Sequence, residues 1–140
     1  MSKIAVVYWS GTGNTEAMAA AVAAGARSAG AEVSVLTPAQ FSPEQVSAYD
    51  AIAFGCPSMG MEQLEEAEFE PMFTACQNRL SGKTIALFGS YGWGDGEWMR
   101  SWEAQCRDCG AQLACQSVIC CQMPSEEDLA SCEALGRALA

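Results

Sequence analysis

The chain has 140 residues, of which seven are Lys or Arg and seventeen are Asp or Glu, so its formal net charge is −10. This length suits a single domain with a sizeable core, and we treat residues 1–140 as one domain. The negative charge disfavours nucleic acid and anionic membranes as partners and favours proteins with basic surfaces, and no apolar run is long enough to span a bilayer.

Apolar strands alternate with helical segments along the chain, which predicts an α/β fold with a parallel sheet and helices on both faces. The chain opens with a strand at Ile4–Trp9, a helix at Thr15–Ala29 and a strand at Glu32–Leu36. A second helix is expected from Ser42, because Pro43 and Gln45 complete a start signal with a capping box. The remaining elements are a strand at Ala51–Gly55, a helix at Leu64–Asn78, a strand at Thr84–Gly89, a helix at Glu97–Cys109, a fifth strand at Leu113–Cys121 and a final helix capped by Ser125.

The segment between the first strand and the first helix, Ser10–Thr15, has the composition of a phosphate-binding loop. Its glycines allow the backbone to curl, and the first turn of a helix offers unpaired N–H groups and a positive dipole end to an anion. No basic residue lies between Lys3 and Arg27, so the phosphate would be held by neutral donors. The expected phosphate-binding residues are Ser10, Gly11, Thr12, Gly13, Asn14 and Thr15.

Two common glycine-rich phosphate loops do not fit this segment. A P-loop requires Gly-Lys-Ser/Thr, and no lysine follows Gly11 or Gly13 closely. A dinucleotide fingerprint that starts at Gly11 meets Glu16 where its third glycine belongs, and that carboxylate would repel a pyrophosphate. A mononucleotide therefore fits better, the alternative being an ordinary strand–helix turn rich in capping residues.

Two further loops suit a flat ring. In an open parallel sheet, ligands bind beyond the carboxyl ends of the strands, where the strand order reverses. The loops after the third and fourth strands combine methionines or aromatic residues with glycines, although Met59 and Trp93, taken singly, are equally compatible with core positions. The candidate ring-binding residues are Ser58, Met59, Gly60, Met61 and Glu62, which we call the first ring loop, and Ser90, Tyr91, Gly92, Trp93 and Gly94, the second ring loop.

The chain resembles the flavodoxins, specifically their short-chain clostridial type. The segments Pro57–Met72 and Ser81–Arg100 are similar to that group almost in register, and the resemblance covers nearly the whole chain. It implies a flavodoxin-like three-layer sandwich, with a five-stranded parallel sheet in the order 2-1-3-4-5. It also implies an electron-transport flavoprotein: a low-potential one-electron carrier that binds FMN non-covalently, uses the semiquinone/hydroquinone couple and substitutes for ferredoxin.

The resemblance also implies roles for individual residues. The loop Ser10–Thr15 would hold the 5′-phosphate, while Met59 and Trp93 would lie against opposite faces of the isoalloxazine ring. Gly60 would offer its carbonyl to the reduced N5–H, and Glu62 would accept a hydrogen bond from N3–H. The backbone amides of Gly92 and Trp93 would serve the pyrimidine end of the ring.

Met61 departs from the family pattern, which usually has a small or polar residue at this place. Presenting the Gly60 carbonyl to N5–H requires a turn in which one central residue has positive φ, and Met reaches that conformation at a cost. We therefore expect Met61 to make the one-electron reduced state less stable than in relatives.

An acidic run follows Glu62. We expect Glu62 in the site and the rest of the run at the surface, where it forms a negative rim for a basic redox partner of a monomeric carrier. The surface members of the run are Glu65, Glu66, Glu68 and Glu70.

The chain has eight cysteines and no histidine. Cys106 and Cys109 have metal-ligand spacing, but no second such pair accompanies them, so we expect no metal site and cysteines used as small core residues. Free thiols fit a reducing, cytoplasmic location, and the N-terminal segment lacks the pattern of a signal peptide. Cys56 and Cys109 would be open to oxidation if exposed.

Two other function classes compete with the carrier. A small FMN-dependent reductase acting on quinones would share the phosphate loop, but this compact chain leaves little room for a second substrate. A phosphorylated receiver domain would share the sheet, but it needs an acidic residue after the third strand and a lysine after the fifth, where the chain has Gly55-Cys56 and Gln122-Met123. We therefore expect an electron-transfer protein and no enzyme.

Overall fold

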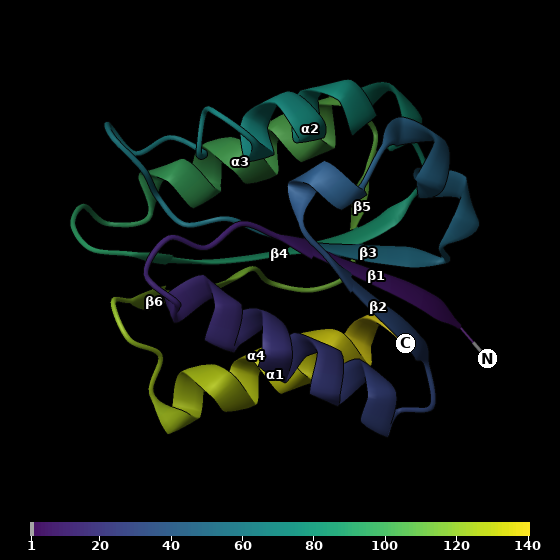
Figure 1. Ribbon diagram of the computed structural model, residues 1–140, viewed down its shortest axis with the longest axis horizontal. Coiled ribbons are helices and arrows are strands. Elements are labelled where there is room, and N and C mark those ends of the chain that lie inside the picture. Colours follow the sequence, from purple (N-terminus) through teal and green to yellow (C-terminus); the bar gives the residue numbers. More distant parts are fainter. Residues whose placement is uncertain (1) are drawn as a thin grey trace.

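The computed structural model describes residues 2–140, which form one parallel sheet covered by helices on both faces (Figure 1). The strand order is β2-β1-β3-β4-β5, with β6 also paired to β4, and this order confirms the predicted fold class. The order reverses between β1 and β3. The strands are β1 (Lys3–Tyr8), β2 (Glu32–Leu36), β3 (Ala51–Gly55), β4 (Thr84–Tyr91), β5 (Gln112–Leu113) and β6 (Val118–Cys121).

The central strands form the middle of the molecule. All residues of β3 are buried, as are Ile4 to Val7 in β1, because helices cover both faces of the sheet. Side chains alternate between the faces: Ile4 and Val6 pack in one cluster, while Ala5 and Val7 pack in the other. The near-continuous apolar runs of these strands are typical of a parallel sheet buried on both sides.

Four α-helices flank the sheet. Helices α1 (Asn14–Ser28) and α4 (Glu126–Leu139) cover one face, and α2 (Phe69–Cys76) and α3 (Glu97–Asp108) cover the other (Figure 1). Within residues 2–140, no helix combines the length and the apolar character that a membrane span requires.

A helix follows Ser42 as predicted, but it is the short 3-10 helix η2 (Pro43–Ala48), and another 3-10 helix, η1 (Pro38–Gln40), precedes it. Each begins with its own capping box, that of η2 confirming the predicted pairing of Ser42 with Gln45, whose Oε1 accepts from the Ser42 N–H at 2.8 Å. Two start signals five residues apart leave neither turn room to extend into an α-helix before β3.

The helix predicted at Leu64–Asn78 is shorter than expected. Helix α2 begins at Phe69, and the 3-10 helix η3 (Gln77–Arg79) follows it. The Glu65 carboxylate accepts hydrogen bonds from the N–H groups of Ala67, Glu68 and Phe69, each at 2.8 Å. A side chain therefore satisfies the donors that an additional helical turn would have used.

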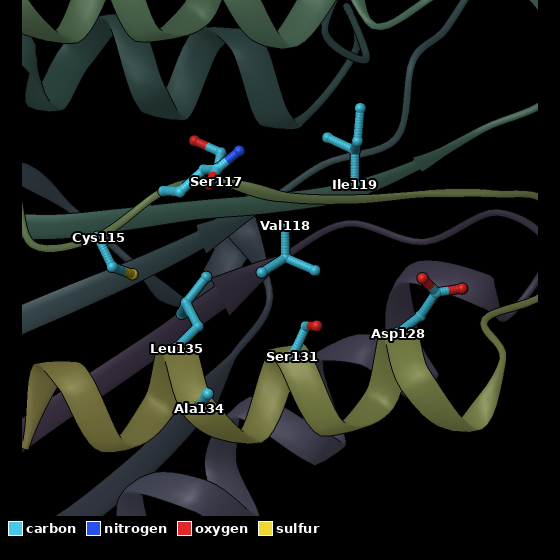
Figure 2. Close-up of a pocket in the computed structure, with 9 residues that line it drawn as sticks. Cys115, Ser117, Val118, Ile119, Asp128, Ser131, Ala134 and Leu135 are labelled. Atoms are coloured by element: carbon cyan, nitrogen blue, oxygen red, sulfur yellow. The ribbon is translucent and has the colours of Figure 1, made fainter.

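The fifth strand is interrupted, contrary to the prediction of one strand at Leu113–Cys121. Ile85 of β4 pairs with Leu113 of β5, but Phe88 pairs with Val118 of β6. Three steps along β4 thus correspond to five along its neighbour, so two extra residues bulge out between β5 and β6. Residues of the bulge and of α4 line an open cleft of about 460 Å³ (Figure 2).

Candidate functional site

The three predicted loops meet at one pocket of about 280 Å³ beyond the carboxyl ends of the strands. This is the position at which the strand order reverses, as expected for a ligand site in an open parallel sheet. The larger cleft beside α4 contains none of the predicted site residues. The pocket is lined by Trp9, Ser10, Gly11, Thr12, Asn14, Thr15, Pro57, Ser58, Met59, Ser90, Tyr91, Gly92 and Gln122.

The first loop is closed by a single hydroxyl. Ser10 Oγ accepts hydrogen bonds from the N–H groups of Gly13 at 3.1 Å and Glu16 at 3.2 Å. Gly13, with φ 97°, adopts the left-handed conformation that turns the chain into α1. Asn14 and Thr15 at the start of that helix line the pocket, which places the positive end of the helix dipole beside it.

Ser90 ties the three loops together. Its hydroxyl lies 3.0 Å from Thr15 Oγ1, and both side chains are buried. Its carbonyl accepts a hydrogen bond from the Ser58 N–H at 2.9 Å. The end of β4 therefore holds the phosphate loop on one side and the first ring loop on the other.

The floor below the ring loops is packed too closely for another side chain. A Cβ on Gly89 would lie 2.2 Å from the Cys56 carbonyl oxygen, which accepts from Trp98 Nε1 at 3.3 Å. Cys56 itself is buried, and burial raises the pKa of its thiol to about 12. Cys56 therefore does not meet the condition of exposure under which oxidation was expected, whereas Cys109 is half-buried.

The first ring loop is a tight turn closed by Met59 and Gln63, whose N–H and carbonyl groups exchange hydrogen bonds of 2.7 and 2.8 Å. Positive φ occurs at Gly60, with 53°, and at Glu62, with 56°, and not at Met61. In this conformation Glu62 is the non-glycine residue of the turn with positive φ, and Met61 lies at the tip, 84% exposed. The expectation for Met61 concerns the form of the turn that presents the Gly60 carbonyl to N5–H, and it stays a prediction.

Glu62 connects the two ring loops. A Cβ on Gly94, which has φ 85°, would lie 2.3 Å from Glu62 Oε1, so the carboxylate packs directly against this glycine. That oxygen is buried, and no residue of the described part of the chain donates a hydrogen bond to it. A buried carboxylate oxygen without a donor costs free energy, so the site lacks one N–H or O–H group.

Several predicted residues flank the pocket without lining it. Trp93 is 61% exposed and Met59, which does line the pocket, is 37% exposed, so both side chains present apolar surface to solvent beside it. Exposed aromatic surface at a pocket rim is typical of a binding site for a planar group. The other predicted residues outside the lining are Gly13, Gly60, Met61, Glu62 and Gly94.

Sequence reasoning missed three lining residues: Trp9, Pro57 and Gln122. Gln122 has positive φ, 61°, and its N–H donates to the Tyr91 carbonyl at 2.7 Å. It belongs to a fourth loop, after β6, which ends at the same edge of the sheet. The rule that ligands bind at the carboxyl ends of strands pointed to this loop as well as to the three we selected.

The acidic run is not uniformly at the surface. Glu66, Glu68 and Glu70 are exposed as predicted, but Glu65 is 7% exposed, so its placement at the surface is wrong. Burial raises the pKa of the Glu65 carboxyl, but hydrogen bonds from Phe69, Glu68 and Ala67 outweigh this effect and hold the pKa below its usual value. Glu65 therefore acts as a charged helix cap and not as part of the rim.

All eight cysteines are free thiols, five of them buried. In residues 2–140 no group of three or more Cys, Asp or Glu side chains is arranged to hold a metal ion.

Comparisons with known proteins find similar chains over nearly the whole length of this one. The flavodoxin family model matches residues 6–136. The chain is 43% identical over 137 residues to the flavodoxin of Megasphaera elsdenii, covering 98% of each chain, and 42% identical over 123 residues to that of Clostridium beijerinckii, covering 88% of this chain and 89% of the other. The solution structure of two-electron reduced Megasphaera elsdenii flavodoxin matches with a TM-score of 0.89 over 97% of each chain.

Proposed function

The chain belongs to the flavodoxin family, whose members are FMN-binding electron carriers, and from this premise we propose which of its residues hold FMN and which surface meets its redox partners. FMN, when bound, supplies one-electron redox chemistry that amino-acid side chains lack. The protein is an electron-transfer protein, and the work of the chain is to bind, orient and shield the flavin.

The observation that carries the residue assignment is the buried Oε1 of Glu62. This oxygen has no donor among the described residues and lies between the two ring loops, against Gly94. A flavin presents one N–H, at N3, on the edge of an otherwise flat ring, and this group would satisfy the oxygen. Glu62 would then fix the orientation of the ring in its plane.

The phosphate of FMN would lie at Ser10–Thr15. The start of α1 offers unpaired N–H groups there, and Thr12 and Asn14 add side-chain donors that line the pocket. The hydroxyl of Thr15 is already held by Ser90, so Thr15 contributes mainly by fixing the loop. With no basic side chain in the lining, the bound phosphate keeps its negative charge uncompensated.

The ring would lie between the loops that carry Met59 and Trp93. Both side chains present exposed apolar surface, which suits the two faces of a planar heterocycle. Gly60, at positive φ in the turn closed by Met59 and Gln63, is the residue whose peptide can turn over at least cost to present its carbonyl to a protonated N5. Tyr91 and Gly92 border the pocket on the opposite loop.

We also propose a docking surface, an oligomeric state and a location for this carrier. We place its docking surface at the rim of exposed Glu66, Glu68 and Glu70, which would attract a partner with a basic face, and we treat the protein as a single FMN-binding domain that acts as a monomer. The eight free thiols support a reducing location such as the cytoplasm. We further propose that the FMN couple is of low potential and serves in place of ferredoxin.

Titration of the apoprotein with FMN and with riboflavin tests the assignment. Glu62→Gln replaces a charge-assisted hydrogen bond by a neutral one and should weaken FMN binding about tenfold. The matched control Glu66→Gln changes an exposed carboxylate of the same run and should leave the affinity unchanged. Riboflavin, which lacks the phosphate, should bind far more weakly than FMN.

Equal affinity for FMN and riboflavin would contradict the phosphate assignment, and an unchanged affinity of Glu62→Gln would contradict the ring orientation. Steady-state NAD(P)H oxidation by the purified holoprotein alone separates the carrier from a quinone reductase. We expect no turnover, because a carrier depends on partner proteins at both ends.

A further inference from the structure

The loop that carries Trp93 has little intrinsic order. It runs from Gly92 to Gly96 between β4 and α3 and contains three glycines, two of which, Gly94 and Gly96, have positive φ of 85° and 93°. Glycine has more backbone freedom than any other residue, so ordering such a segment costs more conformational entropy than ordering an average loop. Something other than local propensity must hold the Trp93 loop in one conformation.

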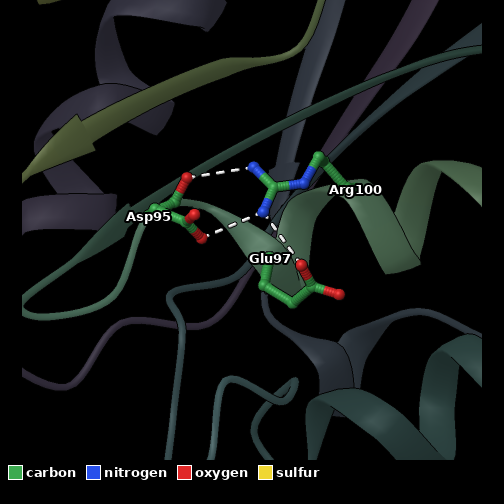
Figure 3. Close-up of polar contacts among 3 residues, drawn as sticks. All are labelled: Asp95, Glu97 and Arg100. Atoms are coloured by element: carbon green, nitrogen blue, oxygen red, sulfur yellow. Dashed lines mark hydrogen bonds and ion pairs between the residues drawn. The ribbon is translucent and has the colours of Figure 1, made fainter.

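The side chain of Arg100, on α3, forms hydrogen bonds with this loop (Figure 3). Arg100 Nη1 donates to the Asp95 carbonyl oxygen at 3.1 Å, and Nη2 donates to Asp95 Oδ1 and Glu97 Oε2, both at 2.9 Å. The acceptors lie on either side of Gly96, and one of them is backbone. The guanidinium therefore fixes the direction of the peptide chain where the loop enters the helix, as a planar fork with several donors can and a single ammonium group cannot.

The same loop is also held one residue earlier in the chain. The Glu62 carboxylate packs against Gly94, and Arg100 holds Asp95, so two consecutive residues after Trp93 are fixed by side chains from different elements. The ion pairs of Arg100 are exposed, with side-chain exposures of 54% for Arg100, 79% for Asp95 and 60% for Glu97, so they contribute little to overall stability. Their effect is local.

We propose that Arg100 is a positioning residue for the flavin: it holds the 92–96 loop so that Trp93 is presented to the ring before FMN arrives. This inference rests on the proposed function, because Trp93 is assigned to the ring there. Preorganising a binding loop lowers the entropy lost when the ligand binds, and the benefit appears mainly in the rate at which the ligand leaves.

Hydrogen exchange of the apoprotein tests the positioning without any flavin. Arg100→Gln should speed the exchange of amides in residues 92–98 and leave the turn at residues 59–63 unchanged. Arg100→Lys keeps the charge but loses the fork, so it should resemble Arg100→Gln. The control is Arg107→Gln, on the same helix, because no ion pair involves Arg107 in the described structure.

FMN release from the holoprotein gives the second measurement. Arg100→Gln and Arg100→Lys should release FMN about fivefold faster than the unmodified protein, and Arg107→Gln should not. In 1 M salt the difference should shrink, because screening weakens the exposed contacts that the variants remove. Flavin fluorescence and visible circular dichroism of the bound state should shift in the two Arg100 variants only.

Unchanged exchange in residues 92–98 of Arg100→Gln would overturn the inference, and so would equal effects of Arg100→Gln and Arg107→Gln on FMN release or full rescue by Arg100→Lys. If the unmodified protein failed to bind FMN, the proposed function would fall, and the role of Arg100 for the flavin with it. The exchange experiment would still show whether Arg100 orders the loop.

Discussion

The two helical layers of this molecule pack against one sheet in opposite ways. Between α1 and α4 the backbones touch: a Cβ on Gly25 would lie 2.0 Å from the Glu133 carbonyl oxygen, and one on Gly136 would lie 2.0 Å from that of Val22. In the layer of α2 and α3, large rings fill the space instead. Phe73 of α2 meets Trp102 of α3 edge to face at a centroid distance of 5.7 Å, and it meets Phe54 of β3 in the same way at 5.1 Å.

The difference bears on how each part of the site is supported. The phosphate loop leads into α1, whose backbone is in contact with that of α4, so the proposed phosphate site stands on the less adjustable layer. The ring loops lead toward α2 and α3. The aromatic side chains between these helices can shift slightly and still bury the same apolar area. Near each helix N-terminus the backbone is held by a single side chain, Glu65 for α2 and Arg100 for α3. The turn whose Gly60 peptide is proposed to turn over therefore lies on the second, more adjustable layer.

Of the substitutions considered below, Gly136→Ala should be the most damaging. The added methyl group cannot be accommodated, because it meets backbone and not a flexible side chain, and we expect a loss of about 3 kcal/mol in the free energy of unfolding. Urea unfolding measures it, with Ser131→Ala on the exposed side of α4 as the control. A loss below about 1 kcal/mol would show that the α1–α4 contact can open.

Glu65→Ala removes the anchor of α2 and should cost about 2 kcal/mol, because three backbone donors lose a charged acceptor. Since the pKa of Glu65 is lowered in the folded protein, its stabilisation is fully present above the ordinary carboxyl pKa of 4.5 and is lost as the pH falls through the folded value. The stability gap between the unmodified protein and Glu65→Ala should therefore narrow in acid. Glu66→Ala, on the exposed neighbour, should show no such gap at any pH.

Phe73→Leu should cost about 1.5 kcal/mol, because the neighbouring rings can close part of the space left by the missing atoms. Phe73 contacts Phe69 and Trp102 as well as Phe54, so the loss is shared among several partners. If thermal or urea unfolding gave a loss as large as that of Gly136→Ala, the aromatic layer would be no more adjustable than the glycine layer.

Trp102→Phe should change the free energy of unfolding by less than about 1 kcal/mol, since the lost packing is offset by removal of a buried indole N–H that has no hydrogen-bond partner within residues 2–140. Trp98 provides the matched comparison, because its Nε1 donates to the Cys56 carbonyl. Trp98→Phe should cost about 1 kcal/mol more than Trp102→Phe. Equal losses would mean that the two indole groups are equally well satisfied in solution.

The parts of the fold that the sequence predicted best are those set by local pattern. The buried strands and the loop at Ser10–Thr15 follow from apolar runs, glycines and hydroxyls that are neighbours in the chain. The loops after the third and fourth strands could be selected because the topology of a parallel sheet brings strand ends together.

The errors arose where a distant or side-chain contact decides the local structure. In the sequence Glu65 is one member of an acidic run. Its role at the start of α2 becomes visible only from the hydrogen bonds that its carboxylate accepts from the N–H groups of Glu68 and Phe69. The bulge between β5 and β6 is set by how these strands pair with β4, and the apolar run at Leu113–Cys121 carries no information about that pairing. In the turn after Met59, nothing in the sequence indicated the positive φ at Glu62, which depends on the paired ends of the turn.

The bulge also affects how this protein behaves in concentrated solution. A continuous edge strand offers a row of free N–H and carbonyl groups to another chain, whereas an edge broken by two extra residues offers only short pieces that cannot pair in one register. The β5–β6 edge is therefore protected against aggregation by its own irregularity. The opposite edge, β2, is a regular strand without such a break, so association of misfolded or crowded copies is expected to begin there, opposed by Glu32 and the high net negative charge.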